Sequence, residues 1–133
     1  MNPHTLAENV RSYLSRAQTE LPVYAAVGTA ELHAPYVLLT CVAEKELIPG
    51  NYTWEYTLEM SLISCACDES DEEMHRSFGT LCTLLESPQA LPSINTNATD
   101  MLLYHLTLHS TAEPQAQDTL FTQSATFRIV VQF

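Results

Sequence analysis

The sequence is short of glycine and of basic residues, and each shortage argues against a class of function. Three glycines occur among 133 residues. They form neither a P-loop nor a G-x-G-x-x-G pattern, so no glycine-rich loop is available to cradle a phosphate. Five Lys and Arg residues stand against 16 Asp and Glu residues, a formal net charge of −11. Non-specific binding to nucleic acid needs Lys and Arg to neutralise phosphates, so this balance argues against it.

Long apolar runs and a basic leader are missing too. No stretch approaches the roughly 18 uninterrupted apolar residues of a membrane span, and no basic amphipathic helix could hold an anionic membrane surface. The start, Met-Asn-Pro-His-Thr, lacks the basic residues and apolar run of a signal peptide. We therefore expect a cytosolic chain, away from membranes, whose four cysteines are reduced.

The cysteines stand at spacings that do not suit a zinc site. Cys65 and Cys67 would share one face of a strand, with His75 and Cys82 downstream. Zinc sites usually pair two C-x2–4-C knuckles held in turns, and Cys82 belongs to an apolar helix stripe. Free cysteines are among the most buried residues, so ordinary packing is the favoured interpretation.

Two pairs of polar side chains lie too far apart along their strands to act together at one site. His105 and His109, like Glu55 and Glu59, stand four apart on expected strands. About 3.3 Å per residue places their Cα atoms roughly 13 Å apart, too far to share one metal directly or to act as a carboxylate pair. The run Asp68–Glu73 lacks the pattern of a calcium loop. No G-x-S-x-G elbow occurs either. We expect no catalytic residue, metal or cofactor, and no enzymatic activity.

Two helices are expected. The first has an apolar stripe within 6–17, with Thr5 as N-cap, Glu8 completing a capping box, and Pro22 ending it. The second starts at a capping box formed by Ser70 and Glu73, and Pro88 and Pro92 end it before a polar loop over 89–99. Its stripe consists of Met74, Phe78, Leu81, Cys82 and Leu85.

Strand patterns fill the rest of the chain. Short strands are expected over 23–27 and 36–42, the latter bounded by a charged turn at 44–46 and followed by a turn at 48–51. From Tyr52 to Leu62 every even position is apolar, which predicts a long half-buried strand. Alternation also marks 102–109 and 121–133. The sequence thus predicts a single α+β domain over 1–133, in the order α-β-β-β-α-β-β. Its mostly antiparallel sheet of four or five strands would carry both helices on one face.

In element order and length, this pattern resembles the tail terminator proteins of long-tailed bacteriophages, of the minor tail protein U type. The matching features are the N-terminal helix from Leu6-Ala7-Glu8-Asn9-Val10, a Pro-Tyr-Val-Leu-Leu-Thr strand at 35–40, a long alternating strand ending in Ser64-Cys65-Ala66-Cys67, an acidic-capped helix, and a closing strand over 125–133.

The resemblance implies a structural virion protein of the phage tail or neck, assembled in the host cytoplasm. Six copies would form a ring that caps the tail tube, stops its polymerisation and offers a docking surface to the head connector. DNA would pass through the lumen without specific binding. Ten acids against two bases between Glu44 and Glu86 could line such a lumen. The candidate interface residues are Glu44, Lys45, Glu46, Asn51, Glu55, Glu59, Asp68, Glu69, Glu113, Gln115, Asp118 and Arg128.

Other functions fit the same sequence. A different head–tail joining or tail-completion subunit would share this outline. A small enzyme or ligand-binding domain would need a concave pocket with convergent polar groups. A monomeric inhibitor could use the acidic face to mimic nucleic acid.

Overall fold

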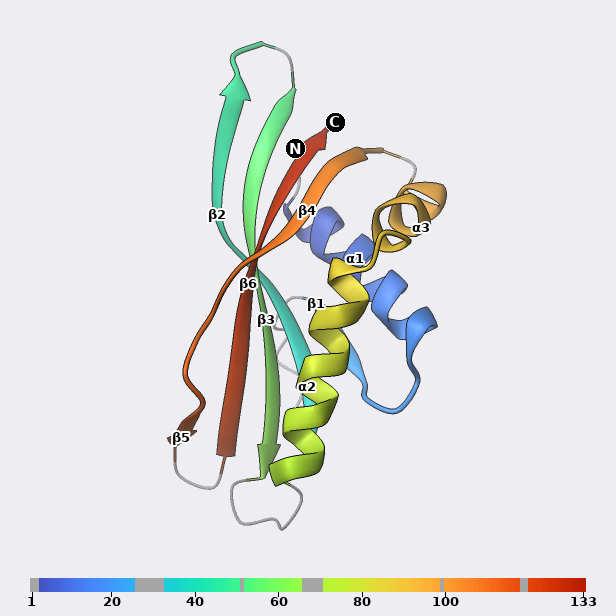
Figure 1. The fold of residues 1–133 in the computed structure, drawn as a ribbon. Helices are drawn as coiled ribbons and strands as arrows, with labels where there is room; N and C mark the ends of the chain where they lie inside the picture. The colour runs from blue at the N-terminus through green and yellow to red at the C-terminus, as the bar shows by residue number, and fades with distance from the viewer. Residues whose placement is uncertain (1–2, 26–32, 51, 66–70, 99, 118–119) are drawn as a thin grey trace.

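The structure is a computed structural model that describes residues 3–25, 33–50, 52–65, 71–98, 100–117 and 120–133 (Figure 1). The fold is α+β, as the sequence predicts. Its elements, in chain order, are α1 (Pro3–Ala17), β1 (Val23–Ala25), β2 (Tyr36–Ile48), β3 (Thr53–Cys65), α2 (Asp71–Glu86), α3 (Ala90–Asn97), β4 (Leu102–Thr111), β5 (Gln115–Gln117) and β6 (Leu120–Gln132).

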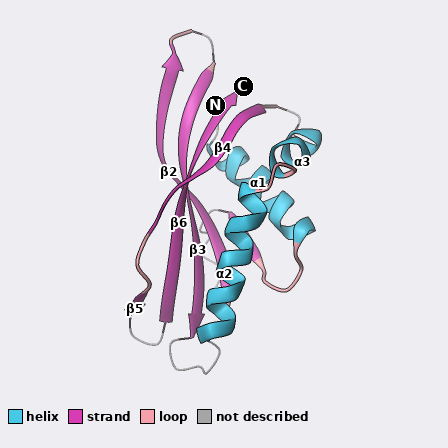
Figure 2. Ribbon diagram, in the orientation of Figure 1, coloured by secondary structure: helices cyan, strands magenta, loops and turns pink. Residues whose placement is uncertain are grey.

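The described strands form one mostly antiparallel sheet with the order β1-β2-β3-β6-β4, and β5 also pairs with β6. β6 therefore lies between β3 and β4, although it comes last in the chain (Figure 2). The expectation that neighbouring strands pair antiparallel fails for β1 and β2, which are parallel over Val23–Ala25 and Val37–Leu39. The sheet has one strand more than the sequence predicts, because β5 adds a strand of three residues to the five expected.

All three helices lie on one face of the sheet (Figure 1). The long central strands follow the predicted alternation. Tyr56, Leu58, Met60 and Leu62 of β3 are fully buried under the helices. β6 contributes Ala125, Phe127, Ile129 and Val131, which are also fully buried. Among the described residues these side chains and those of the helices form one hydrophobic core.

Both expected helices are present, with corrected ends. α1 starts at Pro3, so Thr5 lies inside the helix rather than at its N-cap, and Glu8 instead pairs with Arg11 at 2.8 Å. Proline suits a first turn because the N–H it lacks would have no partner there. In α2, Leu81 and Leu85 are buried as predicted. Ser70, its proposed N-cap, lies outside the described residues.

A third helix, α3, replaces part of the loop expected over 89–99. Pro92 is tolerated because it falls in the first turn, and Ala90 and Ile94 are buried against the core. The Asn95 side chain makes two hydrogen bonds to the Leu103 backbone, at 2.8 and 2.9 Å. The polar composition of this segment therefore anchors the helix to β4.

β2 is longer than predicted. The expected charged turn at 44–46 is strand, because Glu44, Lys45 and Glu46 continue the pairing of β2 with β3. The turn itself lies at Pro49 and Gly50, within the predicted range. None of the described helices is long and apolar enough to cross a membrane.

Candidate assembly interface

The outer half of β2 projects beyond the helices (Figure 1). Every residue from Val42 to Gly50 is exposed, and so is Tyr52 across the turn. We call Val42–Gly50 together with Tyr52 the hairpin arm. It exposes large apolar side chains at Val42 (51%), Ile48 (52%) and Tyr52 (68%). Apolar surface of this kind, displayed on a protruding segment, is typical of an interaction site.

Regular strand pairing along the free edge of the arm is hindered. β1 covers only Val37–Leu39 of β2, so among the described strands none pairs with the other side of the arm. Two bulges, at Val42 and Leu47, interrupt the register, and Lys45 stands between them. Bulges and edge lysines are the means by which proteins prevent edge-to-edge association. The arm is therefore suited to contacts through its side chains.

The tip of the arm holds an aromatic residue in an unfavourable backbone conformation. Tyr52 has φ +55°, in the left-handed region that bulky residues rarely adopt, and it follows Gly50 at φ +78°. Its carbonyl accepts a hydrogen bond from Phe133 N–H at 3.0 Å, which fixes the tip to the last residue of the chain.

Aromatic side chains support the base of the arm. The Tyr56 ring lies 6.4 Å from Trp54 and 6.1 Å from Phe133, measured between centroids. The Tyr56 hydroxyl is buried and has no partner in hydrogen-bonding geometry among the described residues. Burial raises its pKa well above the usual range, and the nearby Glu44 and Cys41 add to this effect. The phenol therefore stays neutral.

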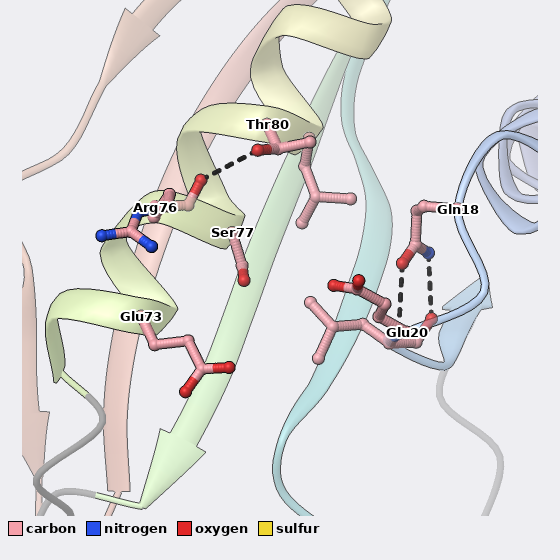
Figure 3. Close-up of a pocket in the computed structure, with 8 residues that line it drawn as sticks. Gln18, Glu20, Glu73, Arg76, Ser77 and Thr80 are labelled. Atoms are coloured by element: carbon pink, nitrogen blue, oxygen red, sulfur yellow. Dashed lines mark hydrogen bonds between the residues drawn. The ribbon is translucent and has the colours of Figure 1, made fainter.

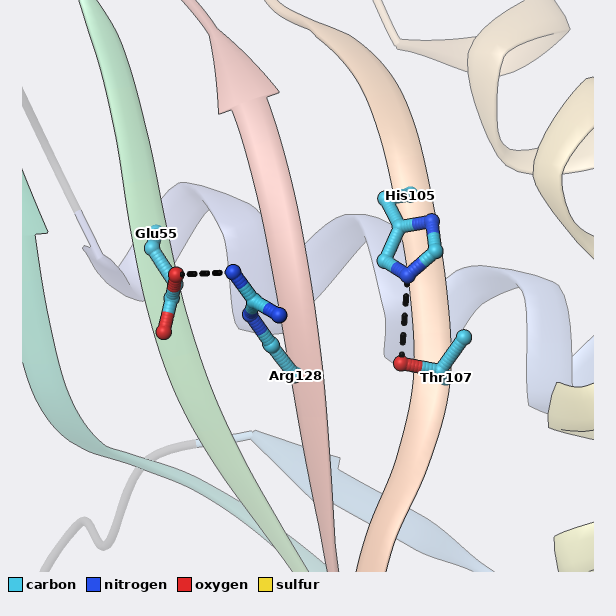
Figure 4. Close-up of polar contacts among 4 residues, drawn as sticks. All are labelled: Glu55, His105, Thr107 and Arg128. Carbon is cyan, nitrogen blue, oxygen red and sulfur yellow. Dashed lines mark hydrogen bonds and ion pairs between the residues drawn. The ribbon is translucent and has the colours of Figure 1, made fainter. Parts of the chain in front are cut away.

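The face of the sheet opposite the helices gathers several of the predicted interface residues. Arg128 and Glu55 form an ion pair at 2.7 Å, and Lys45 stands opposite Glu55 in the register (Figure 4). His105 and Thr107 of β4 lie beside them, with a 3.4 Å contact between His105 Nε2 and Thr107 Oγ1. Arg128 and Glu55 are thus already paired with each other within the chain.

A polar hollow of about 370 Å³ lies farther along the same face. Glu59, Glu113 and Gln115 line it, so the structure brings three more of the predicted residues together. Ser61 and Ser124 at its floor share a hydrogen bond of 3.0 Å. Asn51, Asp68, Glu69 and Asp118, which complete the predicted set, lie outside the described residues.

The acids of the middle of the chain do not form one patch over the described residues. Glu44 and Glu46 lie on the arm, while Glu72 and Glu73 belong to the start of α2, at the opposite end of the molecule (Figure 1). The single acidic lining suggested by the sequence is therefore divided, with further acids, Glu55 and Glu59, on the sheet face opposite the helices.

A second polar hollow, of about 210 Å³, separates α2 from the segment after α1 (Figure 3). Glu20, Glu73 and Arg76 lie around it. The Gln18 side chain is used structurally, with hydrogen bonds of 2.9 and 3.0 Å to the Leu21 backbone. Thr80 donates to the Arg76 carbonyl at 3.1 Å. Two of its polar side chains therefore serve the local fold.

A third hollow, of about 540 Å³ and larger than the other two, lies between α2 and the β4–β5 connection, and we call it the α2–β4 pocket. Its walls are mostly apolar, and His75 and Gln123 share a 2.9 Å hydrogen bond in it. Cys82 also lines it, but burial, with a smaller contribution from Glu86, raises the pKa of this thiol to about 11. A cysteine nucleophile needs a lowered pKa, so Cys82 is poorly suited to catalysis.

Sequence reasoning predicted the strand over 102–109 but missed this pocket and the exposure of Leu102, Tyr104 and Leu108 on β4. The signal was present in part, because Leu102–Thr111 contains no Asp, Glu, Lys, Arg or Pro, the residues that usually protect an edge strand. No group of His, Cys, Asp and Glu that could hold a metal occurs among the described residues.

Comparison with known proteins supports the fold alone. No family model matches the sequence, and no curated protein matches it. A solved structure whose name states no function matches with a TM-score of 0.54 and 13% identity, over 97% of this chain and 92% of that one. At this identity the likeness establishes a shared architecture and carries no function.

Proposed function

We propose that this protein is a structural subunit that associates with copies of itself into a ring, as a tail terminator of a long-tailed bacteriophage. Six copies would cap the tail tube, stop its polymerisation and join it to the head connector. The hairpin arm is the observation that carries this proposal. It exposes Val42, Ile48 and Tyr52 to solvent, and a partner that covers these side chains would gain their burial.

The sequence resemblance and the charge of the chain also support a ring. A net charge of −11 would let DNA pass through a lumen without sticking, because few bases are available to hold phosphates. Another head–tail joining protein would share these features, and its binding partner would distinguish it from a terminator.

The test combines mass and tube length. Native mass spectrometry of the purified protein should show a ring, with about six copies of the 14.8 kDa chain. Added to the polymerising tube protein encoded by the same genome, the ring should bind one tube end and arrest elongation. A protein that remains monomeric and leaves tube growth unchanged would refute the proposal.

A further inference from the structure

The α2–β4 pocket contains a buried polar group that lacks a partner. Gln123 is 2% exposed, and its Oε1 contacts His75 Nδ1 at 2.9 Å. Its Nε2 is buried with no hydrogen-bond partner among the described residues. A buried amide donor without an acceptor is costly. Because this nitrogen is covered in the single chain, the Gln123 side chain must turn toward the pocket before a ligand there can supply the missing acceptor.

The walls of the pocket indicate what kind of ligand it could bind. Phe78 and Cys82 from α2, with Leu108 and Pro114 from the β4–β5 side, present mainly apolar surface. A volume of about 540 Å³ lies within the range of roughly 300–1,000 Å³ usual for binding sites. The pocket is thus suited to an apolar or aromatic body that carries a neutral hydrogen-bond acceptor.

We infer that the pocket receives the hairpin arm of a second copy of this chain, with Tyr52 inserted side chain first. This inference rests on the proposed function and names its contact. The Tyr52 ring is 68% exposed at the tip, and its hydroxyl can accept a hydrogen bond from the Gln123 amide. The bulges and Lys45 hinder pairing along the arm's edge, which leaves its side chains to make the contact.

The positions of arm and pocket make the contact head-to-tail. Along β6, the arm tip lies level with Gln132, because Tyr52 is next to Thr53 and Thr53 pairs with Gln132. The pocket lies level with Gln123, which is nine residues away, or about 30 Å at roughly 3.3 Å per residue. An arm that far from its own pocket is suited to reach a neighbour's pocket. A heterologous contact of this kind generates rings or filaments.

The charges near the pocket are compatible with an acidic arm. β4, which borders the pocket, carries His105 and His109 and no acid, so Glu44 and Glu46 meet no like charge along that strand. Glu113 lines the pocket and Glu86 lies near Cys82, and both carboxylates are exposed to solvent.

Complementation between two variants tests the inference. Tyr52→Ala removes the inserted side chain and keeps the pocket, whereas Leu108→Lys places a charge in the pocket and keeps the arm. Leu108 is 36% exposed, so the fold should tolerate lysine. Each variant alone should associate at least about tenfold more weakly than the wild type. An equimolar mixture should form a 1:1 dimer that grows no further, as seen by native mass spectrometry.

Matched controls separate the pocket from general surface effects. Tyr24→Ala and Leu120→Lys change an exposed tyrosine and an exposed leucine away from the pocket, at 38% and 40% exposure, and both should assemble like the wild type. If the wild type forms rings but the mixture of arm and pocket variants stays monomeric, the inference is wrong and the proposed function survives. A wild type that neither assembles nor caps tubes overturns both.

A third variant excludes a purely structural role for Gln123. Gln123→Leu removes the unpartnered amide nitrogen and also the hydrogen bond to His75, so the thermal midpoint should change little, because the two effects oppose each other. Association should nevertheless weaken several-fold, because the hydroxyl of Tyr52 loses its donor. Unchanged association would contradict insertion of Tyr52 at this position.

Discussion

The two halves of β2, an apolar inner half and a charged outer half, belong to one continuous strand but have different roles in the structure. In the inner half, Val37 and Leu39 are fully buried beneath the helices and β1 pairs alongside. In the outer half, from Val42 onward, every residue is exposed and the helices end short of the strand (Figure 1). The inner half thus contributes to stability, and the outer half is available for association.

The largest difference in stability should separate two valines of this strand, one in each half, when each is replaced by alanine. Val37→Ala deletes two buried methyl groups and should lower the free energy of unfolding by about 2 kcal/mol. Val42, at 51% exposure, should give a change within about 0.5 kcal/mol on the same substitution. Urea denaturation measures both. Equal losses would mean that the arm is part of the folded core.

Alkaline pH should lower the free energy of unfolding, because the partly buried Cys82 thiol resists ionisation in the folded protein. The pKa of Cys82 is about 11 in the folded protein against 9.0 for the free thiol, mainly because of burial. The folded state thus favours the protonated thiol, and this contribution is complete below pH 9 and lost as the pH rises towards 11. We expect a loss of about 1 kcal/mol, less than the full pKa difference implies because the thiol is only half buried.

Denaturation at pH 8.5 and 10.5 checks this effect, with Cys82→Ala as control. The burial of Tyr13 and Tyr56 raises the pKa of each phenol too, so some alkaline destabilisation should remain in the control. Identical pH dependence in the two proteins would show that Cys82 contributes nothing.

Replacing the strained tip residue should separate stability from assembly. Tyr52→Gly relieves a left-handed conformation that costs an L-residue roughly 1–2 kcal/mol, partly offset by the entropy of glycine. A net gain of about 0.5 kcal/mol in stability should accompany weaker association. A variant that is less stable and assembles normally would contradict the role given to the arm.

The smallest effect on stability should come from the ion pair on the face of the sheet opposite the helices. Arg128→Gln breaks the pair with Glu55, whose side chains are 48% and 24% exposed, and should cost about 0.5 kcal/mol or less. Arg128→Lys should recover most of it at low salt. A loss of ring mass in Arg128→Gln would instead place a subunit contact on this face.

Hydrophobic periodicity correctly predicted the buried side chains of strands in which successive residues alternate between the two faces without interruption. Met60 and Phe127 are buried where the alternation over 52–62 and 121–133 places them. It failed at bulges. In β4 the bulge at Tyr104 shifts the phase, so that Leu103 is buried while Leu102 and Tyr104 are exposed.

The candidate site was harder to predict, because the hydrophobic pattern of a strand does not show which part of the strand the helices cover. Val42 ends an apolar run in the sequence, yet a bulge and the lack of a covering helix expose it. Gln123 stands at a position that the alternation assigns to the core, but only the structure shows that its amide nitrogen faces no partner. Of the described polar residues chosen from the sequence, some lie on the arm, Glu55 and Arg128 pair with each other, and the rest line the polar hollow of the sheet face.

The most direct test of self-assembly is the mass of the wild-type protein in solution, measured by native mass spectrometry over a dilution series with and without tail tubes. A closed ring of constant mass, with about six copies, is the result expected if the hairpin arm joins neighbouring copies. A monomer at every concentration, which also fails to bind or cap the tubes, would contradict it.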